Sequence, residues 1–394
     1  MTILSDRINA LETSATLAMA AKARELREQG KDIIGLSLGE PDFGTPDFIQ
    51  EAAIQAVKDG YNSYTPVDGY VELKDAIIKK FKRDNQLTYD RSQIVVSTGA
   101  KQSLYNLAQV CLNDGDEVIL PCPYWVSYRD IVQLAGGIAV EVQTGIETDF
   151  KMTAAQLEAA ITPKTKMLWY SSPCNPSGSI YSKKELEALA EVLEKHPQII
   201  VVSDEIYEHI NYVGDHVSMA QLPSMYDRTV TVNGMAKAFA MTGWRIGYLG
   251  GPTTIARACN KIQGQVTSGA NCIAQRASIT GLEADPSKIQ YMVDQFKERR
   301  TLILDLLKEI PGFQCNEPEG AFYVFPDISY YFGKTLKGQT IQNATDFSMF
   351  LLEHALVATV TGDAFGGPNC IRISYAASQE NIKEAIERIK NALS

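Results

Sequence analysis

The sequence predicts an α/β protein with a mostly parallel central sheet, flanked by helices on both faces, and a smaller α+β domain. Three observations predict it. Short apolar runs alternate with helical patterns through the middle of the chain, a long amphipathic pattern follows, and mixed strand and helix patterns close the chain. Alternation of this kind is typical of βαβ units, whose parallel strands lie buried between two helix layers.

The expected strands are short apolar runs that end in polar residues, glycine or proline. They span residues 94–97, 117–120, 138–142, 166–170, 199–203 and 229–232. The clearest intervening helix, at 183–195, has apolar residues at helical spacing and a capping box of Ser182 with Glu185. Thr153 and Gln156 predict the start of the helix before it in the same way.

The helix expected at 287–310 follows Pro286 and ends before Pro311-Gly312. Beyond it we expect strands at 321–325 and 370–374 and a final helix, hence a second domain. The N-terminal stretch has a helix at 14–29 and a strand at 33–38 that could pack on either domain. We therefore divide the chain into residues 1–46 (an arm and part of the small domain), 47–286 (the large domain) and 287–394 (a connecting helix and the C-terminal small domain).

Composition excludes several classes of protein. The formal net charge of −10 gives no general attraction to nucleic acid or anionic membranes, so a small anionic ligand would need a local basic site. The seven cysteines form no CxxC pair, as expected for free thiols in a reducing compartment, and the four histidines show no metal-ligand spacing. Without an apolar signal segment or a long apolar run, we expect a cytoplasmic protein with no metal centre.

Five of the expected strands are followed by loops rich in polar, aromatic, glycine and proline residues. These loops span residues 98–102, 121–125, 171–178, 203–207 and 233–237. Such residues are common in ordinary turns, so one loop alone means little. In an open parallel sheet, however, ligands bind at the carboxyl edge, and five loops with complementary chemistry favour a site there.

Each candidate residue has a particular chemistry. Gly99 and Ala100 open a helix whose free N–H groups attract an anion, and Trp125 offers a flat face for stacking. A buried Asp204 would need a cation, a desolvated Lys237 would be a nucleophilic amine, and Arg245 could bind phosphate. Taken singly, each of them is more often a core residue, a cap or an ion-pair partner.

Together these groups match the needs of pyridoxal 5′-phosphate. Its phosphate needs an anion seat and its ring a stacking face. Its aldehyde needs an amine, and its ring nitrogen a carboxylate that keeps it protonated. Asn175 and Tyr207 could hydrogen-bond its phenolic oxygen. Tyr207 faces the same side as Asp204 only if the strand breaks into a helical turn after Ser203.

Six segments in order along residues 33–376 match a known family. They are residues 38–43, 123–128, 175–178, 203–208, 233–248 (NGMAKAFAMTGWRIGY) and 372–376. The chain resembles the class I aminotransferases, pyridoxal-phosphate-dependent transferases of fold type I, and within them the bacterial aspartate aminotransferase subgroup. The resemblance makes residues 47–286 the cofactor-binding domain. Two departures stand out. Ala236 and Gly234 replace hydroxyl residues common in the family, and residues 267–272 differ from the usual run.

The resemblance implies a role for each matching residue. Lys237 is the Schiff-base lysine that moves the proton, and Asp204 holds the ring nitrogen. The other implied cofactor contacts are Tyr207 and Asn175 at the phenolic oxygen, Trp125 on the ring, and Gly99, Ala100, Lys101 and Arg245 at the phosphate. Tyr64 resembles a tyrosine that reaches the phosphate of the neighbouring subunit, so we expect a homodimer with shared sites.

The resemblance also implies the substrates, an amino acid and a 2-oxo acid. Arg372 would bind the α-carboxylate, helped by Gly39, Trp125 and Asn175. Lys101 and Thr16 stand where the subgroup receives the second carboxylate of aspartate, and 2-oxoglutarate is the expected acceptor in a ping-pong reaction. Relatives that accept prephenate carry a basic residue where this chain has Glu12, so we rank prephenate below aspartate.

Other functions remain open on the same scaffold. They include aromatic, alanine or prephenate aminotransferases and a β-elimination lyase, because fold alone does not choose among them. A non-catalytic regulatory module would come with a DNA-binding domain, for which the chain has no basic stripe. A nicotinamide dehydrogenase is disfavoured because no G-x-G-x-x-G follows an expected strand.

Overall fold

The computed structural model describes residues 3–11 and 13–394. Its largest element is a seven-stranded sheet with the order β2-β8-β7-β6-β5-β3-β4. The strands are β2 (Ile94–Ser97), β3 (Glu117–Pro121), β4 (Ile138–Val142), β5 (Thr165–Ser171), β6 (Ile200–Asp204), β7 (Thr229–Gly234) and β8 (Gly247–Gly250). The pairs among β3 to β7 are parallel, whereas β8 runs antiparallel to both β7 and β2. The mostly parallel sheet is thus confirmed, and the six strands predicted for it agree with the structure to within one or two residues at either end.

Alternate residues of the strands enter two different cores. Val118 and Leu120 of β3 belong to one cluster, and Ile119 between them belongs to another. The first cluster includes side chains of α5 (Ala100–Cys111), α6 (Ser127–Leu134) and α9 (Thr253–Val266). The second includes α7 (Ala154–Ala160) and α8 (Lys183–Glu194). Helices therefore cover both faces, and both predicted capping boxes are present, at Ser182 with Glu185 and at Thr153 with Gln156.

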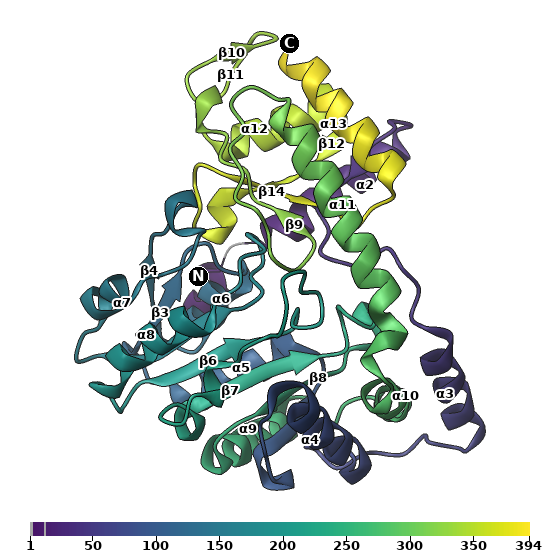
Figure 1. The fold of residues 1–394 in the computed structure, drawn as a ribbon, viewed down its shortest axis with the longest axis vertical. Coiled ribbons are helices and arrows are strands. Elements are labelled where there is room, and N and C mark those ends of the chain that lie inside the picture. The colour runs from purple at the N-terminus through teal and green to yellow at the C-terminus, as the bar shows by residue number, and fades with distance from the viewer. Residues whose placement is uncertain (1–2, 12) are drawn as a thin grey trace.

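Three helices pack together beside the β2 edge, and the sequence pattern gave no bounds for them. They are α3 (Asp47–Lys58), α4 (Val71–Asn85) and α10 (Cys272–Glu283). From α10 the chain continues through a 3₁₀ turn at Pro286–Ile289 into α11 (Gln290–Lys308). The predicted helix at 287–310 is therefore shorter, because its first residues form this tighter turn. Figure 1 shows α11 running from α10 to the C-terminal part of the chain.

Smaller sheets and helices make up the C-terminal part. The strands are β9 (Tyr323–Val324), β10 (Thr335–Leu336), β11 (Gln339–Thr340), β12 (Val357–Ala358), β13 (Val360–Thr361) and β14 (Ile371–Ser374). The helices are α12 (Ala344–Phe350), with a π-helical turn at Leu351–Ala355, and α13 (Gln379–Leu393). In the described residues, no helix is both long enough and apolar enough to cross a bilayer.

The N-terminal stretch packs on this C-terminal part. It contains α1 (Asp6–Asn9), α2 (Ala15–Glu28) and β1 (Ile34–Gly35), and β1 pairs in parallel with β12. Ala23 and Leu26 of α2 share a core cluster with Leu352 and Ala358, and Figure 1 shows α2 beside β12. The strand predicted at 33–38 is only two residues long, because the Ser37 carbonyl accepts from Arg372 instead of a neighbouring strand. The domain boundaries themselves stay a prediction.

Candidate functional site

The predicted site loops all follow strands that run in the same direction. Ser171 at the end of β5 pairs with Asp204 at the end of β6, and Asp204 pairs with Val232 of β7. The loop with Gly99 follows β2, which is parallel to β7 because both are antiparallel to β8. The topology therefore brings these loops to one edge of the sheet.

Asp204 ends β6 as a buried carboxylate. Tyr128 donates its hydroxyl proton to Oδ2 at 2.6 Å, and the Ile206 N–H donates to Oδ1 at 3.2 Å. Burial raises the pKa of Asp204 to about 6, although these two hydrogen bonds act in the opposite direction. Within the described residues no basic side chain forms an ion pair with Asp204. A cationic ligand group would therefore be stabilised beside it.

Lys237 lies three residues beyond β7 with its amine inside the same region. Its Nζ donates to the Gly39 carbonyl at 2.5 Å and lies 5.6 Å from the centre of the Tyr207 ring. Desolvation, together with the positive charge of Arg372, lowers the pKa of Lys237 to about 8. At neutral pH, roughly a tenth of the protein molecules therefore have an uncharged Lys237 amine.

The chain forms a turn directly after Asp204. Such a turn is the condition under which Tyr207 and Asp204 face the same side. The Glu208 N–H donates to the Glu205 carbonyl at 2.9 Å, which forms the turn. The Tyr207 hydroxyl shares a hydrogen bond of 2.7 Å with the Tyr323 hydroxyl. A Cβ on Gly39 would lie 2.5 Å from that Tyr323 oxygen, so Gly39 lets the two segments approach.

Arg372, on β14, points a buried guanidinium toward Asn175. Nη1 donates to Asn175 Oδ1 at 3.0 Å and Nη2 to the Ser37 carbonyl at 2.5 Å. The guanidinium lies 4.6 Å from the centre of the Tyr323 ring, and its Nε is buried without a hydrogen-bond partner in the described residues. A buried, unsatisfied donor of this kind favours an anionic ligand.

Gly99 and Arg245 lie in close contact at the start of α5. Gly99 precedes the helix with φ +83°, and a Cβ there would lie 2.3 Å from Arg245 Nη2. The first N–H groups of α5, on Ala100 and Lys101, have no partner within the helix. Lys101 Nζ lies 4.8 Å from the centre of the Trp125 ring, and desolvation and Arg245 lower the Lys101 pKa. The arrangement gives a basic helix N-terminus beside an aromatic face.

Comparison with known proteins identifies the family. A family model described as aminotransferase class I and II matches residues 31–389. The chain belongs to this family. It is 49% identical to an aspartate/prephenate aminotransferase of Cereibacter sphaeroides, over 99% of this chain and 98% of the relative.

Solved structures support the same fold. The aspartate aminotransferase from Rhizobium meliloti is 44% identical with a TM-score of 0.96, over 100% of this chain and 99% of that one. The aspartate aminotransferase from Thermus thermophilus, determined with maleate, is 42% identical with a TM-score of 0.94 over all of both chains. The protein is thus a pyridoxal-phosphate-dependent aminotransferase of fold type I.

The residues present fit the cofactor of this family. Asp204 is a buried carboxylate without a basic partner in the described residues, as a protonated ring nitrogen requires. Trp125 packs edge-on against Tyr128, with ring centres 5.7 Å apart, so the ring that faces the site is held beside the carboxylate that Tyr128 contacts. Gly99 lets the Arg245 guanidinium approach the N-terminus of α5, and a basic helix N-terminus of this kind suits a phosphate.

Two predicted residues are not in contact with this group. Tyr64 is 98% exposed, so within one chain it contacts none of the other candidates. Thr16 lies in the first turn of α2, and its Oγ1 is buried without a hydrogen-bond partner in the described residues. Its neighbour Ala15 packs in the cluster of Phe365, whose ring lies 4.9 Å from the Arg372 guanidinium. Glu12 lies outside the described residues.

The structure adds two residues to the site that the sequence did not single out. Tyr128 binds Asp204, and Tyr323 contacts Tyr207, Arg372 and Gly39. Tyr128 lies within a matching segment, three residues after Trp125, so its position could have suggested a role. Tyr323 lies in a predicted strand 116 residues from Tyr207, and only the tertiary fold brings them together.

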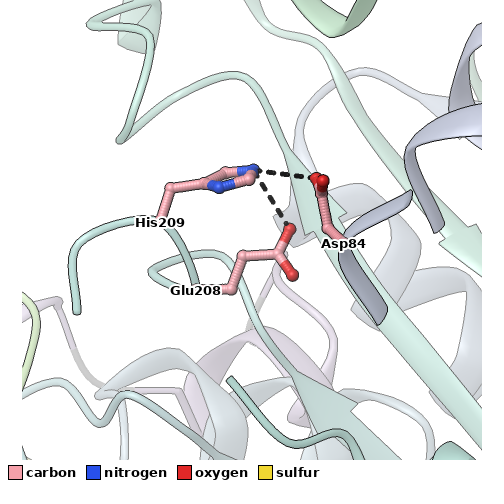
Figure 2. A group of neighbouring side chains, drawn as sticks. All are labelled: Asp84, Glu208 and His209. Carbon is pink, nitrogen blue, oxygen red and sulfur yellow. Dashed lines mark ion pairs between the residues drawn. The ribbon is translucent and has the colours of Figure 1, made fainter. Parts of the chain in front are cut away.

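A second polar cluster lies behind the site (Figure 2). His209 Nε2 is 3.7 Å from Asp84 Oδ2 and 3.4 Å from Glu208 Oε1, a grouping that could suggest a metal centre. The ammonium of Lys80 is wholly buried there, paired with Glu208 and 3.8 Å from Asp84. Because Lys80 already supplies the cation, we assign no metal to this cluster.

Proposed function

We propose that this aminotransferase transfers the amino group of L-aspartate to 2-oxoglutarate in a ping-pong reaction, in homodimers that share their sites. The observation that supports the proposal most is the convergence of Lys237, Asp204 and Arg372, which offers an amine, a carboxylate and a carboxylate-binding guanidinium to one small molecule.

Bound pyridoxal phosphate supplies a pyridinium ring that withdraws electrons from the substrate Cα. Asp204 would hold the protonated ring nitrogen, because a cation beside this buried carboxylate offsets the cost of its burial. Tyr128 keeps that carboxylate oriented through its 2.6 Å hydrogen bond. Tyr207 and Asn175 donate to the phenolic oxygen, and Trp125 packs on the ring.

Lys237 both holds the cofactor and moves the proton. With the cofactor bound, the Lys237 Nζ would hold it covalently and, once freed as an amine, would serve as the base that accepts the proton from the substrate Cα. The depressed pKa of Lys237 favours this role because the amine must be free before it can accept a proton. The Gly39 carbonyl, which accepts from Nζ, keeps the amine in place.

The two substrate carboxylates have separate partners. Arg372 binds the α-carboxylate as a pair of parallel hydrogen bonds, with Asn175 and the Gly39 backbone beside it. Lys101 and Thr16 bind the second carboxylate, and the unpartnered Thr16 Oγ1 supports this role. Maleate, found with the Thermus thermophilus relative, is a four-carbon dicarboxylate like aspartate.

The phosphate is bound by Gly99, the N–H groups of Ala100 and Lys101, and Arg245. Tyr64 completes this site from the partner subunit. Tyr64 is 98% exposed in one chain, so its side chain is accessible to a partner subunit.

The test is a panel of amino acids assayed with 2-oxoglutarate, using Lys237→Ala as the inactive control. We expect aspartate to give the highest kcat/KM, and glutamate to form in equal amount to oxaloacetate. Release of pyruvate and ammonia without an acceptor would instead identify a lyase. Faster reaction with alanine or aromatic amino acids would reject aspartate as the main donor.

Prephenate is the second candidate substrate, since the Cereibacter sphaeroides relative is named for both aspartate and prephenate. Prephenate also has two carboxylates, so the same two cationic partners could receive it. The sequence ranks it lower because of Glu12. Prephenate offered as the amino acceptor with aspartate as donor tests this ranking. The ranking predicts a lower kcat/KM than that of 2-oxoglutarate, and an equal or higher value would reverse it.

A further inference from the structure

Two side chains join the turn after β6 to the end of β7. Glu208 comes directly after Tyr207, and Asn233 precedes Lys237 by four residues. Asn233 Nδ2 donates to Glu208 Oε1 at 2.7 Å, and Asn233 Oδ1 accepts from the Gly234 N–H at 2.7 Å. Asn233 lies one residue past the last pair of β6 with β7, which is Asp204 with Val232, and it still pairs with Tyr248 of β8. Glu208 lies in the turn that follows β6.

The hydrogen bond between Glu208 and Asn233 is shielded from water, and positively charged neighbours stabilise the Glu208 carboxylate. Glu208 and Asn233 are 5% and 2% exposed, so water competes little for their hydrogen bonds. Burial alone would raise the pKa of Glu208, but the charges of Lys80 and His209 hold it well below its usual range. Figure 2 shows the Glu208 carboxylate directed toward His209 and Asp84. Glu208 is therefore a fixed anion that two buried amides can hold.

Asn85, in α4, is the second amide on this carboxylate. Its Nδ2 donates to Glu208 Oε2 at 2.8 Å, and its Oδ1 accepts from Lys80 at 2.7 Å. Asn85 is fully buried, like Asn233. The two amides thus make similar hydrogen bonds to the same carboxylate, but only Asn233 lies on the segment, at the end of β7, that leads directly to Lys237.

We propose that Glu208 and Asn233 are positioning residues. Their hydrogen bond holds the backbone that carries Lys237 at a constant position relative to Tyr207 and Asp204. The inference rests on the roles proposed for those three residues. An amine and a carboxylate that act on opposite ends of one ring must keep a constant separation, and small displacements of reacting groups cost large factors in rate. Neither Glu208 nor Asn233 needs to touch substrate or cofactor for this effect.

The experiment compares Asn233→Ala with Asn85→Ala. For Asn233→Ala we expect kcat to fall by roughly 10- to 100-fold with KM for the amino acid within about threefold. We also expect the apoprotein to bind pyridoxal phosphate about tenfold more weakly in a fluorescence titration, since the cofactor contacts would no longer be held in register. For Asn85→Ala both quantities should stay within about twofold, while thermal unfolding shifts downward for both variants.

Equal losses in kcat and cofactor affinity for the two variants, or no loss in Asn233→Ala, would overturn the proposal. If Asn233→Ala does not fold, Asn233→Ser replaces it, because a serine is too short to hold both Glu208 and Gly234, and the same difference from Asn85→Ala is expected. The proposed function is judged separately. It fails if the unmodified protein does not transaminate, whereas the positioning proposal fails if only the contrast between variants is absent.

Discussion

Asp204 is a buried carboxylate whose charged form is disfavoured by its surroundings. Its carboxylate is buried and has two hydrogen bonds but no basic partner in the described residues. Groups held in unfavourable environments are common at functional sites, because the ligand provides the missing interaction. The cofactor should therefore stabilise the protein in addition to enabling the reaction.

Asp204→Asn should stabilise the apoprotein in a pH-dependent way. The pKa of Asp204 is about 6 in the folded protein and near 4 when unfolded, so the folded state binds more protons between these values and loses stability as pH rises through them. Asparagine does not titrate. The free energy of unfolding of the variant should equal that of the unmodified apoprotein below pH 4 and exceed it by about 1–3 kcal/mol above pH 6. Urea unfolding from pH 4 to 8 measures it, and a constant difference across that range would contradict the assignment.

Arg372→Lys should separate binding of the α-carboxylate from folding. A lysine keeps the positive charge but offers no planar pair of donors and leaves Asn175 Oδ1 without its partner. We expect kcat/KM for aspartate to fall by about 100-fold or more. Steady-state kinetics measure the loss, with a thermal melt to confirm folding. A folded variant with unchanged kcat/KM would show that another residue binds the carboxylate.

At the scale of elements, the site depends on how α5 begins. Gly99 adopts a left-handed backbone conformation that an L-residue resists, and its Cα faces the Arg245 guanidinium. The turn therefore has two requirements, the conformation itself and the space for Arg245. They can be tested apart because Gly115 has a similar φ of +86° with no atom near the position of a Cβ.

Gly99→Ala should weaken cofactor binding by about tenfold, because the new Cβ displaces Arg245 from the phosphate site. Both Gly99→Ala and Gly115→Ala should lower stability by about 1–2 kcal/mol through backbone strain. Equilibrium titration of each apoprotein with pyridoxal phosphate, beside thermal melts, gives both quantities. Equal cofactor affinity in the two variants would exclude Arg245 from the phosphate site.

The elements that sequence predicts well are those with a strong local pattern. The runs at 94–97 and 138–142 match β2 and β4 in full, because apolar residues and turn residues mark both ends. β8 was missed because glycines stand at both its ends and it runs against its neighbours. β1 is shorter than predicted because the Ser37 carbonyl accepts a hydrogen bond from Arg372, which is 335 residues away in the sequence.

The same division holds within the site. Asp204 ends β6, and Lys237 and Asn175 come after β7 and β5, so their place at the sheet edge could be predicted from local patterns. Tyr323 and the Glu208–Asn233 bond could not, since they depend on which loops the fold brings together.

At the scale of the whole molecule, one chain leaves the proposed phosphate site without Tyr64. The side chain extends into solvent, and other large apolar side chains are exposed near the N-terminus, including Ile3 and Leu4. Exposed apolar groups of this kind are typical of surfaces that pair with another subunit. A twofold dimer would bury them and exchange Tyr64 between sites.

Mixing two defective variants tests this exchange. Tyr64→Ala should bind the cofactor about tenfold more weakly, and Lys237→Ala should be inactive. In a mixed dimer, one site combines Lys237 from one subunit with Tyr64 from the other. After denaturation and refolding together at limiting cofactor, about a quarter of the unmodified activity should return, because half the dimers are mixed and each has one intact site. Activity no higher than the mean of the separate variants would exclude the exchange.

The central claim is that the Lys237 amine is the group that bonds to the cofactor. The most direct measurement is borohydride reduction of the protein with pyridoxal phosphate bound, followed by proteolysis and mass spectrometry. We predict that the cofactor mass is found on the peptide containing Lys237 and that the Lys237→Ala protein gains none there. Attachment at another lysine, such as Lys101, with Lys237 unmodified would contradict the account.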